Sequence, residues 1–157
     1  MLKLAWYLIT DRDYWTEAAR FHQPTPEREL ADRLNRLFSD EGPFTAAHTV
    51  TATDIMLQMA AYLGDAVPHG RATVPDRAHL DRLLHALNLL LAYMAQAGGR
   101  LAHQVKTGTG ADLSELSPTD REELTRTLAA ATDRVEEAAG LVKQVHLCAR
   151  SRQGARR

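Results

Sequence analysis

The sequence predicts an all-α protein, an elongated helical bundle of about five helices built on one long antiparallel helical hairpin. Three observations support this fold class. Glycine and proline are sparse, with 9 and 6 residues, and most of them stand between apolar segments. Two long segments place small or apolar residues at alternating four- and three-residue spacings. Several apolar segments follow a Ser or Thr with an acidic residue three positions later, the pattern of a helix N-terminus.

Length and composition are those of one ordinary globular domain. The chain has 157 residues, 45% of them hydrophobic, and a net charge of −1, which excludes a strongly charged polyelectrolyte. We expect one domain over 1–150, followed by a basic disordered tail over 151–157. The apolar run over 1–9 is shorter than the about 20 residues of a membrane span. This run also lacks a basic leader and a small-residue cleavage site, so we expect a cytoplasmic protein with no membrane association. Because Cys148 is the single cysteine, we expect no internal disulfide.

The first three predicted helices cover 2–22, 26–39 and 52–67. Aromatic residues are concentrated in the first, and its first nine residues fit a short strand as well as a helix. The second begins after Thr25, which a proline follows at the first helical position. The third begins after Thr51, which has an acidic residue three positions later.

The last two predicted helices, over 76–106 and 118–150, form the antiparallel hairpin. Gly98-Gly99 would usually indicate a break, but the spacing continues through it, so we expect one helix with a close backbone approach at Gly98. Ser117 is the predicted cap of the last helix. The predicted contact seam consists of small and apolar residues: Leu80, Leu84, Leu87, Leu91, Met94, Gly98, Leu101 and Val105 on one helix, and Leu124, Leu128, Ala131, Val135, Ala138, Val142, Val145 and Ala149 on the other.

A polar stripe lies beside this seam, at Asp81, His85, Asn88 and Gln96. No two histidines of the chain are three or four residues apart, which is the spacing that helical metal sites use. We therefore interpret the stripe as the solvent-facing side of a leucine-rich helix. No serine or cysteine stands in a nucleophile motif, and we expect no enzymatic activity, metal or cofactor.

The leading functional hypothesis is a non-enzymatic interaction or assembly protein, homo-oligomeric or a subunit of a complex. Long helices expose long faces that three shorter helices cannot fully cover. If 2–22 is helical, Trp6 and Trp15 are nine residues apart and face opposite sides. We assign Trp15 to the core, and Trp6 with the adjacent Tyr7 to a partner contact.

Two alternatives remain open from the sequence. A regulatory bundle that binds a small molecule would line its pocket with flexible and aromatic side chains, for which the candidates are Met56, Met59, Met94 and Tyr14. Association with nucleic acid, which we consider weaker, would use the arginines of the C-terminal tail, Arg150, Arg152, Arg156 and Arg157.

Overall fold

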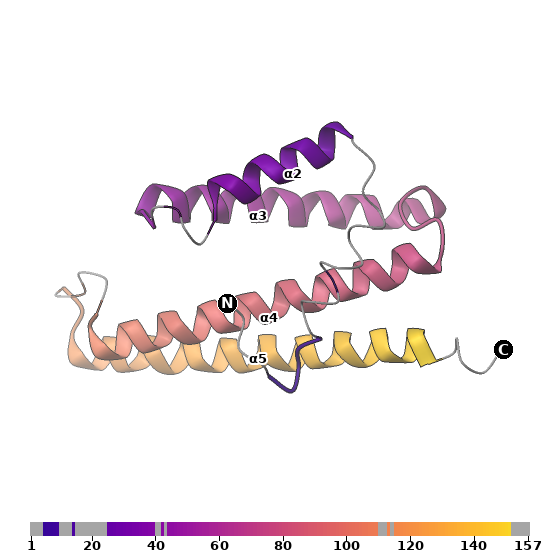
Figure 1. Ribbon diagram of the computed structural model, residues 1–157. Coiled ribbons are helices and arrows are strands. Elements are labelled where there is room, and N and C mark those ends of the chain that lie inside the picture. Colours follow the sequence, from indigo (N-terminus) through magenta and orange to yellow (C-terminus); the bar gives the residue numbers. More distant parts are fainter. Residues whose placement is uncertain are drawn as a thin grey trace. The chain divides into compact units, whose positions relative to one another are not determined.

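The computed structural model describes residues 5–9, 14, 25–39, 42, 44–109, 113 and 115–151. All regular secondary structure in these residues is helical, which confirms the predicted all-α class for this part of the chain (Figure 1). In chain order the elements are α2 (Pro26–Leu37), α3 (Ala46–Ala66), the 3-10 helix η2 (Val67–Ala72), α4 (Arg77–Thr107) and α5 (Pro118–Ser151). The chain divides into two compact units, residues 15–77 and residues 1–14 with 78–157, which we describe separately.

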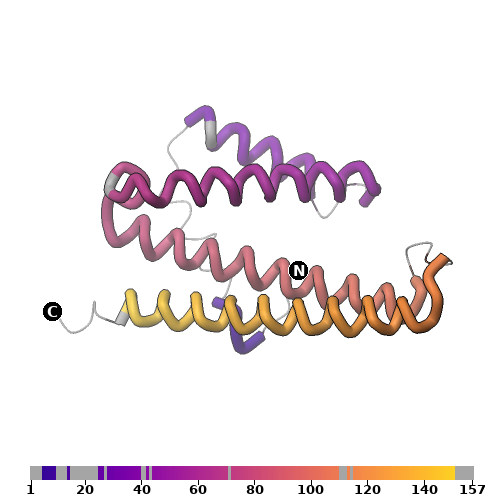
Figure 2. The backbone as a smooth tube through the Cα atoms, turned by 180° about the vertical axis from the view of Figure 1, so that it is seen from behind, coloured from indigo at the N-terminus to yellow at the C-terminus, as the bar shows by residue number. Residues whose placement is uncertain are grey.

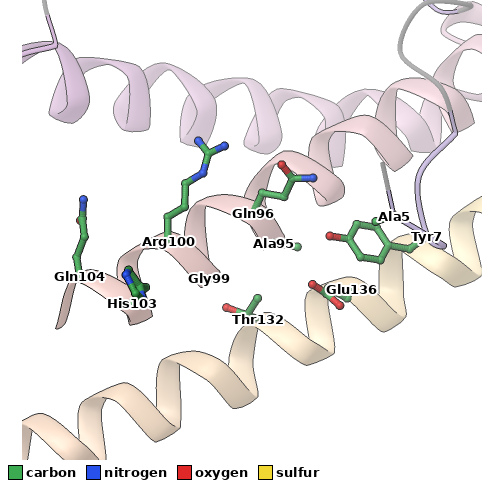
Figure 3. A pocket seen from close by; sticks show the side chains of 10 residues that line it. All are labelled: Ala5, Tyr7, Ala95, Gln96, Gly99, Arg100, His103, Gln104, Thr132 and Glu136. Carbon is green, nitrogen blue, oxygen red and sulfur yellow. The ribbon is translucent and has the colours of Figure 1, made fainter. Parts of the chain in front are cut away.

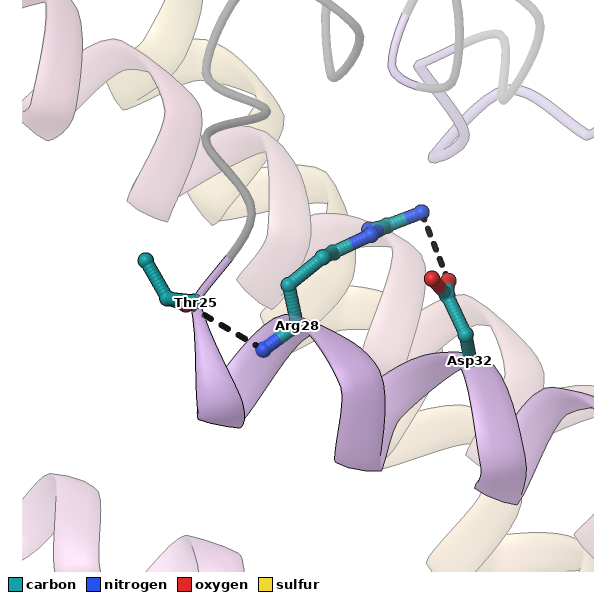
Figure 4. A network of polar contacts seen from close by, with 3 residues as sticks. All are labelled: Thr25, Arg28 and Asp32. Carbon is teal, nitrogen blue, oxygen red and sulfur yellow. Dashed lines mark hydrogen bonds and ion pairs between the residues drawn. The ribbon is translucent and has the colours of Figure 1, made fainter.

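Local capping explains where the helices of the 15–77 unit begin. The Thr25 hydroxyl accepts a hydrogen bond from the backbone N–H of Arg28 at 3.3 Å, and Arg28 is paired with Asp32 at 2.9 Å (Figure 4). For α3 the predicted start at 52 is wrong. Thr45 is the cap, because its hydroxyl accepts from the backbone N–H of His48 at 3.2 Å, so the helix begins six residues earlier and Thr51 lies inside it.

In the other unit, residues 5–9 are not helical, which corrects the helix predicted over 2–22 for this part. Trp6 and Tyr7 form a turn, in which the N–H of Leu8 donates to the carbonyl of Ala5 at 3.1 Å. Tyr14 is helical. The remaining residues of the predicted helix, including Trp15, lie outside the described residues.

The side chain of Asn88 accounts for this conformation. Its Oδ1 accepts from the N–H of Ile9 at 2.8 Å. Its Nδ2 donates to the carbonyls of Tyr7 and Ala139, also at 2.8 Å each. Asn88 has no exposed surface, so one amide of α4 binds the N-terminal segment and α5 together inside the unit.

The long helices α4 and α5 lie side by side along most of their length (Figures 1 and 2). Helix α4 passes through Gly98-Gly99 without a break, as predicted. Helix α5 begins after Ser117, whose hydroxyl accepts from the N–H of Asp120 at 3.1 Å. Three contacts join the two helices, and they pair Asp81 with His146, Asn88 with Ala139, and Gly98 with Thr132. Higher residue numbers on α4 therefore meet lower residue numbers on α5.

The face that α4 buries is rotated by about one residue from the predicted seam. The buried residues His85, Asn88, Ala92, Ala95 and Ala102 each directly follow a predicted seam residue. On α5, Ala139 and His146 are buried in the same way, one position after Ala138 and Val145. Of the predicted seam, Val105 is buried, whereas Leu80, Met94, Leu101, Leu124 and Val145 are exposed.

At Gly98, which belongs to the predicted seam, α4 packs tightly against Thr132 of α5. A Cβ atom at Gly98 would lie 2.6 Å from Oγ1 of Thr132, so the two helices approach more closely here than leucine side chains would allow. The rotation places Asn88 inside, where it satisfies buried backbone groups.

The two adjacent glycines give a matched test of this close approach. We expect Gly98→Ala to lower the free energy of unfolding by about 1–3 kcal/mol, because the added methyl group displaces a Thr132 hydroxyl that is bonded to the carbonyl of Leu128 at 2.8 Å. Gly99→Ala meets Thr132 only at 3.9 Å and should raise stability by up to about 1 kcal/mol through helix propensity. Equal effects of the two changes in urea unfolding would contradict the close contact.

The role of Asn88 can be tested by truncation. Asn88→Ala should lower the free energy of unfolding by roughly 3 kcal/mol or more, because it leaves buried backbone groups without hydrogen bonds. Asn35→Ala on the exposed side of α2 is the control, and it should change stability by less than about 0.5 kcal/mol. Chemical unfolding followed by circular dichroism measures both, and a similar loss in the two variants would refute the proposed role of Asn88.

Candidate functional site

The candidate site is a pocket between α4, α5 and the N-terminal segment, all within one unit (Figure 3). Its volume of about 560 Å³ falls within the range of small-molecule sites. The lining residues are Ala5, Tyr7, Ala95, Gln96, Gly99, Arg100, His103, Gln104, Thr132 and Glu136.

The pocket exists because small residues face it from α4. Ala95 and Gly99 stand four residues apart on α4 and leave room above the helix surface. Thr132 and Glu136 have the same spacing on α5 and form the opposite wall. The Tyr7 ring closes one end beside Glu136 (Figure 3), and only 4% of Tyr7 is exposed.

Tyr7 carries the clearest electrostatic signal of the site. Burial raises the pKa of its phenol above the ordinary value, and the negative charge of Glu136 and the hydrogen bond to this carboxylate raise it further. A hydrogen bond with Gln96 acts in the opposite direction. The phenol therefore stays protonated at neutral pH and donates to Glu136, which holds the carboxylate at the end of the pocket.

A second polar cluster lies inside the same unit. His85 and His146 are 2% and 1% exposed, with ring centroids 5.3 Å apart. Nδ1 of His146 is 3.5 Å from Oδ1 of Asp81, which is ion-pair distance if the imidazole is protonated. The rings of Tyr14 and His85 meet edge to face, with their centroids 5.2 Å apart. Within the described ranges, no three His, Cys, Asp or Glu side chains are placed to hold a metal ion.

This cluster corrects the interpretation of the polar stripe. His85 and Asn88 were expected on the solvent-facing side, yet both are buried between the helices and the N-terminal segment. Asp81 lies beside them, and Gln96 contributes to the pocket. His146 was missed because it comes from α5, and no spacing within one helix relates it to Asp81 or His85.

The remaining predicted site residues lie in several places. Met56 and Met59 are exposed on α3 and Met94 is exposed on α4, and none of the three lines the pocket. Tyr14 packs against the core of its unit. Five polar residues of the described pocket lining were not predicted, at positions 100, 103, 104, 132 and 136. The first three share one side of α4 with Gln96 and could have been found by helical spacing.

The predicted partner residues Trp6 and Tyr7 have different surroundings. Trp6 is 64% exposed, although its ring rests on Gly140, where a Cβ atom would collide with it. Nζ of Lys143 donates to the Trp6 carbonyl at 2.6 Å. Because Tyr7 is buried, Trp6 is the member of the pair that is open to a partner.

Of the four arginines of the predicted basic tail, the structure describes only the first. Arg150 is exposed near the end of α5, while Arg152, Arg156 and Arg157 lie outside the described residues. No helix found in the described part of the chain is both long and apolar enough to cross a membrane. Comparisons with protein-family models, curated proteins and solved structures found no significant match for this chain.

The raised pKa of Tyr7 predicts a pH dependence of stability. Because the folded pKa lies above the unfolded value of about 10, its contribution is complete below that value and is lost as pH rises through the folded pKa. We expect Tyr7→Phe to be less stable than the wild type at pH near 8, and this difference to shrink toward pH 11. Guanidinium unfolding across this range measures it, with Tyr62→Phe on α3 as an exposed control. A difference that does not vary with pH would contradict the assignment.

Proposed function

We propose that this chain is a non-enzymatic assembly protein whose antiparallel α4–α5 hairpin binds a second copy of itself. One observation carries the proposal. An outer stripe of large apolar residues on α4 and α5 is between 39% and 62% exposed, and it comprises Leu80, Met94, Leu101, Leu124, Leu141 and Val145. Exposed large apolar side chains gathered on one side of a protein are typical of interaction sites.

The geometry of the helix pair supports one common face for both halves of the stripe. On each helix, the residue that directly follows an outer-stripe residue faces the other helix. Each outer-stripe residue therefore lies about 100° around its own helix axis from the contact between the helices. In two helices of opposite direction, this rotation has opposite senses in space. Both halves of the outer stripe then fall on the same face of the hairpin.

A second copy fits this face by symmetry. Within each helix the stripe residues other than Leu141 are separated by multiples of seven, the repeat that helices use to pack against other helices. A two-fold axis through an antiparallel hairpin would set the α4 half of the stripe on the α5 half of the copy, as in an isologous dimer interface. Small and polar residues already occupy the contact between α4 and α5, which leaves the leucines and methionine for the interface.

Self-association is tested by light scattering on a sizing column at increasing protein concentration. We expect the mass to reach twice the 17.4 kDa of one chain at tens of micromolar. Met94→Glu with Leu101→Glu should weaken the dimer by at least about 30-fold, the equivalent of roughly 2 kcal/mol. Leu147→Glu is the matched control, since Leu147 is exposed to a similar degree but lies outside the outer stripe. A monomeric wild type, or equal effects of the variants, would refute the proposal.

A further inference from the structure

A second pocket lies where α4 ends and α5 begins (Figure 1), within the same unit as the candidate site but without a shared lining residue. Its volume is about 550 Å³. The lining consists of Lys106, Pro118, Arg121, Glu122, Thr125 and Arg126. Cationic side chains outnumber anionic ones by three to one, and a cavity whose walls carry mostly one sign of charge attracts a ligand of the opposite sign.

The geometry of the two helices brings these side chains to one place. On α5 the lining residues follow each other at three- and four-residue spacings, which places them on one face of the helix. The contact of Gly98 with Thr132 fixes the register of α4, and eight residues further Lys106 is about level with position 124 of α5. A Cβ atom at Gly108 would lie 3.4 Å from Nη1 of Arg121, so this arginine reaches the end of α4.

Two of the cations, Lys106 and Arg121, have no carboxylate partner among the residues that the structure describes. Arg126 differs from them, because it is paired with Glu123. Nη2 of Arg121 donates to the carbonyl of Leu113 at 3.0 Å, which fixes the position of the guanidinium. Its Nε is buried and has no hydrogen-bond partner in the described part of the chain. The pocket therefore has two positive charges that no described carboxylate neutralises.

The other polar groups of the lining accept hydrogen bonds. The Thr125 hydroxyl donates to the carbonyl of Arg121 at 2.8 Å, so toward a ligand its oxygen can only accept. The ionised carboxylate of Glu122 is also an acceptor only. These two acceptors are neighbours of Arg121 on one face of α5. A ligand that uses the whole lining therefore combines an anionic group with hydrogen-bond donors such as hydroxyl groups.

We propose that this pocket binds a small phosphorylated polyol, with its phosphate at Lys106 and Arg121 and its hydroxyl groups at Glu122 and Thr125. A phosphate monoester carries close to two negative charges at neutral pH, which matches the two unpaired cations. Arginine and lysine are the side chains that bind phosphate in proteins. The volume is within the range of small-molecule sites and leaves room for the polyol. Binding here requires no self-association through the outer stripe.

Calorimetric titration of the full chain with three probes tests the ligand class. The probes are ribose 5-phosphate, ribose, which lacks the phosphate, and inorganic phosphate, which lacks the polyol. We expect ribose 5-phosphate to bind at least tenfold more tightly than either of the other two. Equal affinity for inorganic phosphate would overturn the polyol part of the assignment, and equal affinity for ribose would overturn the phosphate part. The absence of binding by all three would overturn the pocket as a site for this class.

Two variants then assign the parts of the ligand to residues. Lys106→Gln should weaken the binding of both ribose 5-phosphate and inorganic phosphate at least fivefold, because it removes one of the two unpaired cations. Glu122→Ala should reduce the preference for ribose 5-phosphate over inorganic phosphate to less than threefold, because it removes an acceptor for the hydroxyl groups. Both side chains are exposed, so we expect the fold to persist, and circular dichroism checks this.

Arg134→Gln is the matched control. It also removes one positive charge from the chain, but Arg134 is paired with Glu137 and does not line the pocket. Affinity for both phosphate probes should therefore stay within twofold of the wild type. Unchanged affinity in Lys106→Gln, an unchanged preference in Glu122→Ala, or an equal loss of affinity in Arg134→Gln would overturn the assignment of residues.

Discussion

The hydrogen bonds of Asn88 are the interaction on which the rest of this unit depends. One amide binds the backbone of Tyr7 and Ile9 and the carbonyl of Ala139, so it joins α4 to segments that are 79, 81 and 51 residues away in the chain. It holds the N-terminal turn against α4 and α5. That turn places Tyr7 at the end of the pocket and the ring of Trp6 on Gly140. The pocket is therefore a consequence of one buried polar residue inside a helix that is otherwise rich in leucine.

Local signals in the sequence predicted the long helices well. Arg77–Thr107 and Pro118–Ser151 agree with the predicted ranges within one residue at each end, because a cap, a proline and glycines mark these ends nearby in the chain. The same signals misplaced the start of α3, because Thr51 has an acidic residue three positions later and Thr45 does not, yet Thr45 is the cap. The non-helical turn at residues 5–9 was beyond local reasoning, because Asn88 determines it from a distance.

The error in the seam has a related cause. A four- and three-residue spacing is present in two neighbouring stripes of α4, one apolar and one of small and polar residues, and hydrophobicity favoured the wrong one. The buried side chains of His85 and Asn88 lie on the second stripe. The candidate site could be predicted only in part, because its residues come from two helices. Gln96 and Arg100 share one helix, whereas Thr132 and Glu136 approach them only when α5 packs alongside.

The contact between α4 and α5 also fixes how far one helix can slide past the other. A seam of uniform leucines would accept a shift by one heptad at little cost, because every position offers the same surface. Here such a shift would move Asn88 away from the Ala139 carbonyl and would bring a side chain other than that of Thr132 against Gly98. The pair therefore has a single register, and a small insertion in either helix would be felt along its whole length.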